Sequence, residues 1–433
     1  MLEKRTALVF ATAIDTAYAI CHSLFHDSQK WRIILAKSKV SGSRRDKSKI
    51  VDEVIYFDLP DLCTYWRTDL ISSPILPEER RFIDQLKTNC IDKSVGIIFA
   101  NCDYVVSLLA KARQEFIDLG VACVTPSMEM YTQVCDKFHV VKFAQEFGVP
   151  VPKTILPKNR KELDVFLSEN NGHCFVKRRF STGSAAVMHL KSLQEVDQLC
   201  AQRELFKGDH IFQEFIPGIR EPSANAFFSP KGELLATWSL EKLRYLGPSH
   251  STAIRITKNL PEMDLLVKGL ELNRYNGIIG VQFKTDSRTN KNVLIECNPR
   301  LGYNSRMILP LALKYGINII AILGESFLSE KPLDQFPYSL PSGLTALSFF
   351  DDAMLLPRLL RSTIKNPSRA RINNIFCLLK SMKMLSPFNS NSLDAVTKSL
   401  SIDSKFALIS SKNLLVHSWN LGGNMEKWGK IES

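Results

Sequence analysis

Two short segments carry polar side chains of the kind that bind a divalent cation. Gln282 lies in the segment 280–286, and Glu296 and Asn298 lie in the segment 293–298. Both segments have the composition and length of β-strands, and the polar residues between them suit a hairpin turn. Because side chains alternate between the faces of a strand, pairing of the two segments would bring these three side chains together. Such oxygen ligands suit a Mg²⁺ ion that the phosphates of a nucleotide also hold.

The residues after Asn298 extend this candidate site. Pro299 would end the second strand, and Arg300 would leave it beside the same amide and carboxylate groups. By itself, a Glu-x-Asn pair is also expected on a solvated surface hairpin. The chemical interpretation therefore depends on whether the rest of the chain supplies the groups that bind a nucleotide.

Two lysines are candidates for binding the phosphates. Lys137 opens an expected helix directly after Asp136, and Lys177 lies at the end of an expected strand. A loop of small residues follows Lys177, and its backbone N–H groups could close over a triphosphate. The loop comprises Ser181, Thr182, Gly183 and Ser184. It is not a Walker loop, because no Gly-Lys-Ser/Thr follows at the required spacing.

A strand end further along the chain is the candidate site for the nucleoside. It comprises Gln213, Glu214, Phe215 and Ile216 and is followed by a Pro-Gly turn. Such a strand end presents backbone N–H and C=O groups to the edge of an adenine, while apolar side chains line the pocket. Glu221, just beyond the turn, could accept hydrogen bonds from both ribose hydroxyls.

Composition places the chain among ordinary globular proteins. It has 433 residues, of which 45% are hydrophobic and 23% charged, enough for two or three domains. We find no secretory signal and expect no transmembrane helix. The ten cysteines form no Cys-x-x-Cys pair and indicate reduced thiols in a cytoplasmic protein. The net charge of +12 suits an anionic partner without identifying it.

The apolar pattern predicts two architectures in succession. Residues 5–120 alternate short strands with helices at 15–25, 77–88 and 104–119, which is typical of an open parallel α/β sheet. The first strand-to-helix turn contains no glycine, so it lacks a dinucleotide fingerprint. Helices and antiparallel strands then mix as far as about residue 335, which predicts an α+β domain.

The segment 353–387 is strongly basic. It holds seven basic residues and no acidic one, and its apolar positions have helical spacing. A solvated helical face and a contact with anionic lipid or another polyanion are both compatible with this pattern. Only Phe376 interleaves the basic residues as an aromatic, so we expect no nucleic acid partner.

The candidate nucleotide-binding and metal-binding residues follow one another along the chain in an order that resembles the ATP-grasp superfamily. The order is Lys137, Lys177 with its loop of small residues, the strand end 213–216 with Glu221, and Gln282 with Glu296 and Asn298. The resemblance is closest to the carbamoyl-phosphate-synthetase-like and carboxylate–amine ligase branches. The series closes with Glu296-Cys-Asn-Pro-Arg300, and the resemblance covers roughly residues 5–330. It implies an N-terminal open parallel α/β (pre-ATP-grasp) domain, a two-lobed α+β ATP-grasp domain and a basic helical/β C-terminal extension. The expected ranges are 1–120, 121–335 (small lobe about 150–215, large lobe about 216–335) and 336–433.

The resemblance implies how ATP would be held. Lys137 and Lys177 would bind its phosphates, and the loop 181–184 would cover them. The backbone of 213–216 would read adenine, and Glu221 would bind ribose.

It also implies how the reaction would proceed. Gln282, Glu296 and Asn298 would hold two Mg²⁺ or Mn²⁺ ions that bridge the phosphates. Arg300 would neutralise the acyl-phosphate intermediate or the substrate carboxylate. Gln282 stands where many such ligases have an acidic ligand, which lowers the negative charge around the first metal ion.

His250 and Arg255 complete the candidate catalytic groups. They lie in a region that faces the acyl acceptor in relatives, where Arg255 could bind a substrate carboxylate. His250 could serve as a general base, or it could only hydrogen-bond a phosphate or the loop.

We therefore expect an ATP-dependent ligase that joins a small carboxylate, such as an amino acid, to an amine and releases ADP and phosphate. We do not expect carbamoyl phosphate synthesis, because no second grasp and no glutaminase segment is found, nor biotin carboxylation, because the C-terminal third is unlike a carboxylase lid. A nucleotide-binding regulatory protein and an anionic-surface-binding protein acting through 353–387 remain alternatives. A homodimer and a peripheral membrane contact also stay open.

Overall fold

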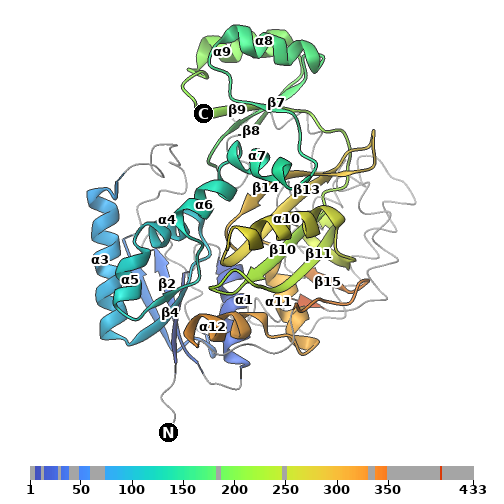
Figure 1. Ribbon diagram of the computed structural model, residues 1–433. Helices are drawn as coiled ribbons and strands as arrows, with labels where there is room; N and C mark the ends of the chain where they lie inside the picture. Colours follow the sequence, from blue (N-terminus) through green and yellow to red (C-terminus); the bar gives the residue numbers. More distant parts are fainter. Residues whose placement is uncertain are drawn as a thin grey trace, which may run out of the picture.

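A computed structural model of the chain shows a mixed α/β molecule (Figure 1). It describes residues 5–10, 14–27, 31–38, 48–58, 74–181, 187–245, 251–329, 337–348 and 400–401. Within these ranges the strands form sheets of five, four and seven strands, called here the first, small and large sheets. The basic segment 353–387 lies outside the described residues.

The first sheet is parallel, with strand order β3-β2-β1-β4-β5, and confirms the predicted open α/β architecture. Its strands are β1 (Thr6–Phe10), β2 (Arg32–Ser38), β3 (Glu53–Phe57), β4 (Val95–Phe99) and β5 (Ala122–Cys123). Its helices are α1 (Ile14–Phe25), α3 (Pro77–Asp92), α4 (Asp103–Lys111) and α5 (Arg113–Asp118). The helix predicted at 104–119 is therefore two helices, which meet at Ala112.

Helices cover both faces of the first sheet, which explains why its strands read as continuous apolar segments. All five residues of β1 are buried: Ala7 and Val9 pack with α1, while Leu8 and Phe10 pack with α3 and α4. The strand order reverses direction between β1 and β4, the position where open α/β sheets commonly bind ligands.

The small sheet is antiparallel, with strand order β6-β9-β7-β8, and lies at one end of the molecule (Figure 1). It comprises β6 (Thr154–Ile155), β7 (Cys174–Arg178), β8 (Val187–Leu190) and β9 (His210–Glu214). Helices α8 (Arg160–Glu169) and α9 (Leu193–Gln202) cover one face and share its apolar core. Asn159 and Ser192 cap the two helices, each accepting a hydrogen bond from a backbone N–H of the first turn.

The large sheet is antiparallel, with strand order β14-β13-β10-β11-β12-β15-β16. It comprises β10 (Ser223–Phe228), β11 (Leu234–Tyr245), β12 (Ser251–Thr257), β13 (Gly277–Thr285), β14 (Asn292–Asn298), β15 (Thr345–Ser348) and β16 (Leu400–Ser401). Helices α6 (Met128–Cys135), α7 (His139–Glu146) and α10 (Pro261–Leu272) pack on one face. Helices α11 (Ser305–Lys314) and α12 (Ile319–Leu328) pack on the other and share a core with α1.

Within the described ranges, no single helix has the length and apolar composition to cross a membrane. Only α11 and α12 together meet that criterion, as a pair bent by 90°. Both helices contribute most of their apolar residues to the core they share with α1.

Candidate active site

The hairpin of β13 and β14 forms as the sequence predicts. The strands pair antiparallel, with Gln282 opposite Glu296 and Gly280 opposite Asn298. The turn between them is closed by the carboxylate of Asp286, which accepts a hydrogen bond of 2.8 Å from the backbone N–H of Arg288. The hairpin therefore brings one carboxylate and two amides to neighbouring positions, with β14 ending at Asn298.

Lys137 connects this hairpin to the expected phosphate loop. Its Nζ lies 4.0 Å from Oε2 of Glu296 and donates hydrogen bonds to Ser181, 3.0 Å to the carbonyl oxygen and 3.2 Å to Oγ. The Lys137 side chain is 6% exposed. Three residues that the sequence analysis assigned separately, to phosphate, loop and metal, are thus direct neighbours.

Asp136 positions Lys137 rather than binding a ligand. Its carboxylate is fully buried and accepts hydrogen bonds of 3.0 and 3.2 Å from Nε of Arg179. It also accepts a hydrogen bond of 2.8 Å from the backbone N–H of Phe138, at the start of α7. Sequence reasoning missed Arg179, because nothing in the local pattern indicates which cation a buried carboxylate will meet.

Lys177 lies on the face of the small sheet opposite α8 and α9. Its Nζ donates a hydrogen bond to Oε1 of Gln213, whose own amide donates to Oγ1 of Thr154 at 3.0 Å. Burial lowers the pKa of Lys177 to about 8, the nearby positive charge of Lys137 acting in the same direction and the carboxylate of Glu296 opposing it. An anion bound beside Lys177 would stabilise the charged form of this lysine.

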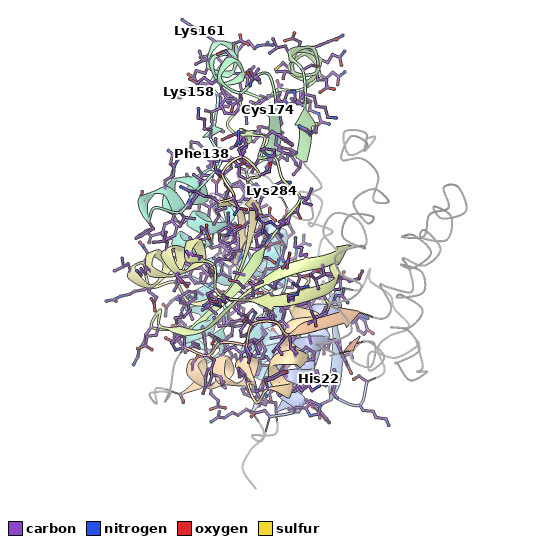
Figure 2. All side chains as sticks on the ribbon, turned by 90° about the vertical axis from the view of Figure 1, so that its right-hand side faces the viewer. His22, Phe138, Lys158, Lys161, Cys174 and Lys284 are labelled. Atoms are coloured by element: carbon purple, nitrogen blue, oxygen red, sulfur yellow. The ribbon has the colours of Figure 1, made fainter. Side chains whose placement is uncertain are left out.

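Glu221, the candidate ribose acceptor, is flanked by two lysines. Nζ of Lys242 lies 3.5 Å from one carboxylate oxygen, and Nζ of Lys284 lies 3.9 Å from the other. Burial lowers the pKa of Lys284, while Glu221 opposes that shift. In Figure 2, Lys284 lies below Cys174 of the small sheet, at the junction of the small and large sheets. The sequence analysis gave these two lysines no role, because only the pairing of distant strands brings them to Glu221.

The strand end at 213–216 leads out of the small sheet as predicted. Strand β9 ends at Glu214, Ile216 is buried, and Gly218 turns the chain. Gly218 has a φ of +140°, and a Cβ there would lie 2.1 Å from the carbonyl oxygen of Thr285, so only glycine fits.

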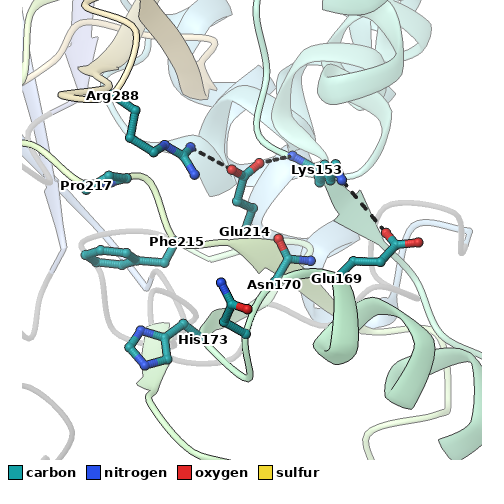
Figure 3. A pocket seen from close by; sticks show the side chains of 9 residues that line it. Lys153, Glu169, Asn170, His173, Glu214, Phe215, Pro217 and Arg288 are labelled. Atoms are coloured by element: carbon teal, nitrogen blue, oxygen red, sulfur yellow. Dashed lines mark hydrogen bonds and ion pairs between the residues drawn. The ribbon is translucent and has the colours of Figure 1, made fainter.

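The Glu214 side chain lines a cavity together with Phe215 and Arg288 (Figure 3), and the strand register turns it to the face of the small sheet opposite Lys177. It pairs with Arg288 at 2.7 Å and accepts a hydrogen bond of 3.1 Å from the backbone N–H of Lys153. The cavity measures about 410 Å³ and does not include the candidate phosphate and metal residues in its lining. Only the backbone of Glu214 is therefore available to the candidate nucleotide site.

Arg300 leaves β14 and crosses to the first sheet. Its guanidinium lies 2.9 Å from Oδ2 of Asp103, the first residue of α4, and 3.3 Å from Oδ1 of Asn298. Burial alone would lower the pKa of Arg300, but Asp103 raises it overall, so Arg300 stays charged. The ion pair joins the end of the candidate metal strand to the helix that follows β4.

Arg255 does not join this group. It pairs with Glu241 across β11 and β12, at 3.7 Å between NH1 and Oε2. The neighbouring residues Leu240 and Ile254 face the core shared with α11 and α12, so Arg255 points to the opposite face of the sheet from Lys242. The expected catalytic position of Arg255 therefore has no geometric support. Four further candidates lie outside the described residues: Thr182, Gly183, Ser184 and His250.

The donor set of the hairpin suits a hard divalent cation. Glu296 supplies a carboxylate, and Gln282 and Asn298 supply amide oxygens, which together match Mg²⁺ that keeps phosphate and water ligands. In the described part of the chain, no three His, Cys, Asp or Glu residues cluster as an all-protein metal site would require. This composition fits a metal ion that arrives with a nucleotide.

Solved structures share this fold. The biotin carboxylase domain of Hydrogenobacter thermophilus 2-oxoglutarate carboxylase, in complex with MgADP, ADP and bicarbonate, matches with a TM-score of 0.61 and 13% identity over 79% of this chain and 74% of that one. Campylobacter jejuni biotin carboxylase in a β,γ-ATP complex matches with a TM-score of 0.56 and 15% identity over 80% and 76%. The chain has the ATP-grasp fold.

The ATP-grasp likeness extends to part of a larger enzyme as well. Rhizobium etli pyruvate carboxylase matches with a TM-score of 0.59 and 13% identity over 80% of this chain and 31% of that one. No protein-family model and no curated protein matches the sequence. At these identities the likeness concerns the fold alone, so the expectation that this protein is not a biotin carboxylase stays a prediction.

Proposed function

We propose that this protein is an ATP-dependent ligase that activates a small carboxylate as an acyl phosphate and joins it to an amine. The observation that carries the proposal is the contact of Lys137 with both Ser181 and Glu296. This contact supports a single site that contains the start of the proposed phosphate loop, a buried cation and the candidate metal carboxylate. A buried lysine whose role was only structural would not need to lie beside both a loop of small residues and this carboxylate.

The lysines would bind the phosphates of ATP. Lys137 and Lys177 are buried and already positioned by hydrogen bonds, so they lose little side-chain entropy when an anion binds. The backbone of 213–216 would bind adenine, and Glu221, neutralised by Lys242 and Lys284, would bind ribose.

Gln282, Glu296 and Asn298 would hold the Mg²⁺ ions that accompany the nucleotide. A bound Mg²⁺ would withdraw negative charge from the phosphates that it contacts. Arg300, oriented by Asp103 and Asn298, would neutralise the substrate carboxylate and its acyl phosphate. The carboxylate oxygen attacks the γ-phosphorus and ADP leaves, after which the amine nitrogen attacks the acyl carbon and phosphate leaves. Catalysis then rests on positioning and charge neutralisation.

The first experiment measures ADP and phosphate release with Mg-ATP against pools of amino acids and small carboxylates, each with mass spectrometry of the products. ADP release that requires both a carboxylate and an amine, with a condensed product, establishes the ligase and identifies its substrates. Tight ATP binding with no turnover in any pool would instead favour a regulatory protein. We also propose a homodimer, which a measurement of the molecular mass of the protein in solution would test.

The Glu296→Ala variant tests the metal assignment. We expect at least about a 100-fold loss of turnover, because the variant removes the one carboxylate among the expected metal ligands. The matched control is Glu241→Ala, which removes a carboxylate from the opposite face of the same sheet and should keep turnover within about twofold. Normal turnover in Glu296→Ala, or an equal loss in both variants, would contradict the assignment.

A further inference from the structure

The face of the small sheet that lies opposite α8 and α9 carries an aromatic group beside Lys177. In the β7–β8 register, Phe175 is opposite His189 and Lys177 is opposite Val187. Cys174, Val176 and Leu190 pack under the helices, so the residues that alternate with them face the other way. Phe175, Lys177 and His189 therefore share the face that is turned toward the candidate nucleotide site.

His189 forms a cluster with two phenylalanine rings, Phe175 and Phe215, whose own centroids lie 5.8 Å apart. Its ring is parallel to that of Phe215, with centroids 4.7 Å apart and an interplanar angle of 7°. On the other strand Phe175 stacks on it at 4.8 Å and 27°. Phe215 is the first residue after β9, within the strand end expected to bind adenine. The three rings form one continuous apolar surface at that strand end.

The imidazole of His189 has hydrogen-bonding capacity that the protein does not use. Both ring nitrogens are shielded from solvent, and neither has a hydrogen-bond partner. Burial lowers the pKa of His189, with nearby cations such as Lys191 and Lys284 acting in the same direction, so the ring is neutral at pH 7. A neutral imidazole has one N–H donor and one acceptor, and leaving both unpaired is unfavourable. A ligand that supplies a partner would relieve this cost.

The spacing along β7 relates this group to the phosphate site. Lys177 and Phe175 are two residues apart on one strand, which is a separation of about 6–7 Å. A nucleotide whose phosphates contact Lys177 can therefore lay its ribose along the strand and reach the aromatic group with its base.

We propose that His189 is a nucleobase-recognition residue of this protein. The purine of ATP lies against the surface formed by Phe175, His189 and Phe215, and one ring nitrogen of His189 hydrogen-bonds to it. This inference rests on the proposed binding of ATP and adds a residue that selects the base. It needs no knowledge of the carboxylate or the amine.

The test is the affinity of the full-length protein for AMP-PNP with Mg²⁺, measured by calorimetry. His189→Phe keeps a ring for stacking and removes both nitrogens, and we expect AMP-PNP to bind roughly 3- to 10-fold more weakly. The matched control is His26→Phe, which changes an exposed histidine next to the end of α1, where its ring contacts His22 and Phe25. The control should bind AMP-PNP within about twofold of the wild type.

The second readout is the preference for AMP-PNP over GMP-PNP, which should shrink in His189→Phe and stay unchanged in His26→Phe. A structural role alone would lower the melting temperature and leave this preference intact. His189→Gln keeps one donor and one acceptor, so it should retain more of the preference than His189→Phe does. It also serves as the test variant if His189→Phe does not fold.

Unchanged affinity and preference in His189→Phe would overturn the inference. So would an equal loss of affinity in His26→Phe. A wild-type protein that binds AMP-PNP but turns over no substrate pool removes the ligase proposal and leaves this inference standing. A wild-type protein that does not bind AMP-PNP removes both.

Discussion

Lys177 illustrates how burial prepares a single residue to bind an anion. Burial lowers its pKa to about 8, whereas a lysine in an unfolded chain has a pKa of about 10.4. Between these values the unfolded chain binds more protons, so this residue makes the free protein more stable as the pH rises. Binding of a triphosphate has the opposite effect on the pKa of Lys177 and raises it, because the negative phosphates favour the charged form of the lysine.

We predict that AMP-PNP affinity falls as the pH rises through about 8, where the free protein loses the proton on Lys177. The measurement is a series of calorimetric titrations from about pH 7 to pH 9.5, a range in which an unperturbed lysine stays protonated. Lys177→Met should bind weakly and lose most of this pH dependence. An unaltered pH profile in Lys177→Met would show that another group causes the effect.

At the scale of the elements, the β13–β14 hairpin connects to the small sheet at two places. Its strand β14 carries Glu296, which lies 4.0 Å from Lys137, and Lys137 in turn donates hydrogen bonds to Ser181 after β7. The turn of the hairpin meets β9 directly, through the pair of Arg288 with Glu214. The turn therefore joins the large sheet to the small sheet beside the proposed nucleotide site.

Arg288→Ala should weaken nucleotide binding without unfolding the protein. Arg288 is half-exposed and pairs at 2.7 Å with both Glu214 and Asp286, so loss of these pairs should cost about 1 kcal/mol, or roughly fivefold in the AMP-PNP dissociation constant. The control is Arg220→Ala, which removes the hydrogen bond from Arg220 to Asn290 in the same turn but leaves the pair with Glu214 intact. Equal effects of the two variants would indicate that the turn, rather than the pair, matters.

At the scale of the whole molecule, the first sheet and the large sheet meet at a buried ion pair. Asp103 begins the helix after β4, next to the reversal of strand order, and Arg300 follows the candidate metal strand. The side chains are 8% and 17% exposed, so either charge left alone would remain in a poorly solvated place.

Arg300→Gln should destabilise the protein by about 3–5 kcal/mol, because it leaves the carboxylate of Asp103 buried and unpaired. The double variant Asp103→Asn, Arg300→Gln removes both charges, and we expect its melting temperature to lie above that of Arg300→Gln. A double variant that melts at or below the single one would show that the two residues are not coupled. Turnover should be lost in both variants, since Arg300 is the expected acyl-phosphate contact.

Short-range patterns account for the parts of the protein that the sequence by itself determined. The β13–β14 hairpin needs only alternation and a polar turn, so the neighbouring positions of Gln282 and Glu296 followed from spacing. The parallel first sheet followed from apolar segments that alternate with helices. In each case the interacting residues are close in the chain, or the burial of both faces leaves a strong local pattern.

Only the tertiary structure decided which distant side chains meet. Lys284 reaches Glu221 because β13 lies beside β10 at the edge where the chain enters the large sheet, and Asp103 reaches Arg300 because two sheets pack together. The register of β12 turns Arg255 to the opposite face of the sheet from Lys242. A shift of the register by one residue would turn every side chain of the strand to the other face. Charge and residue type give no information on these pairings, since they depend on strand order and register set by the whole fold.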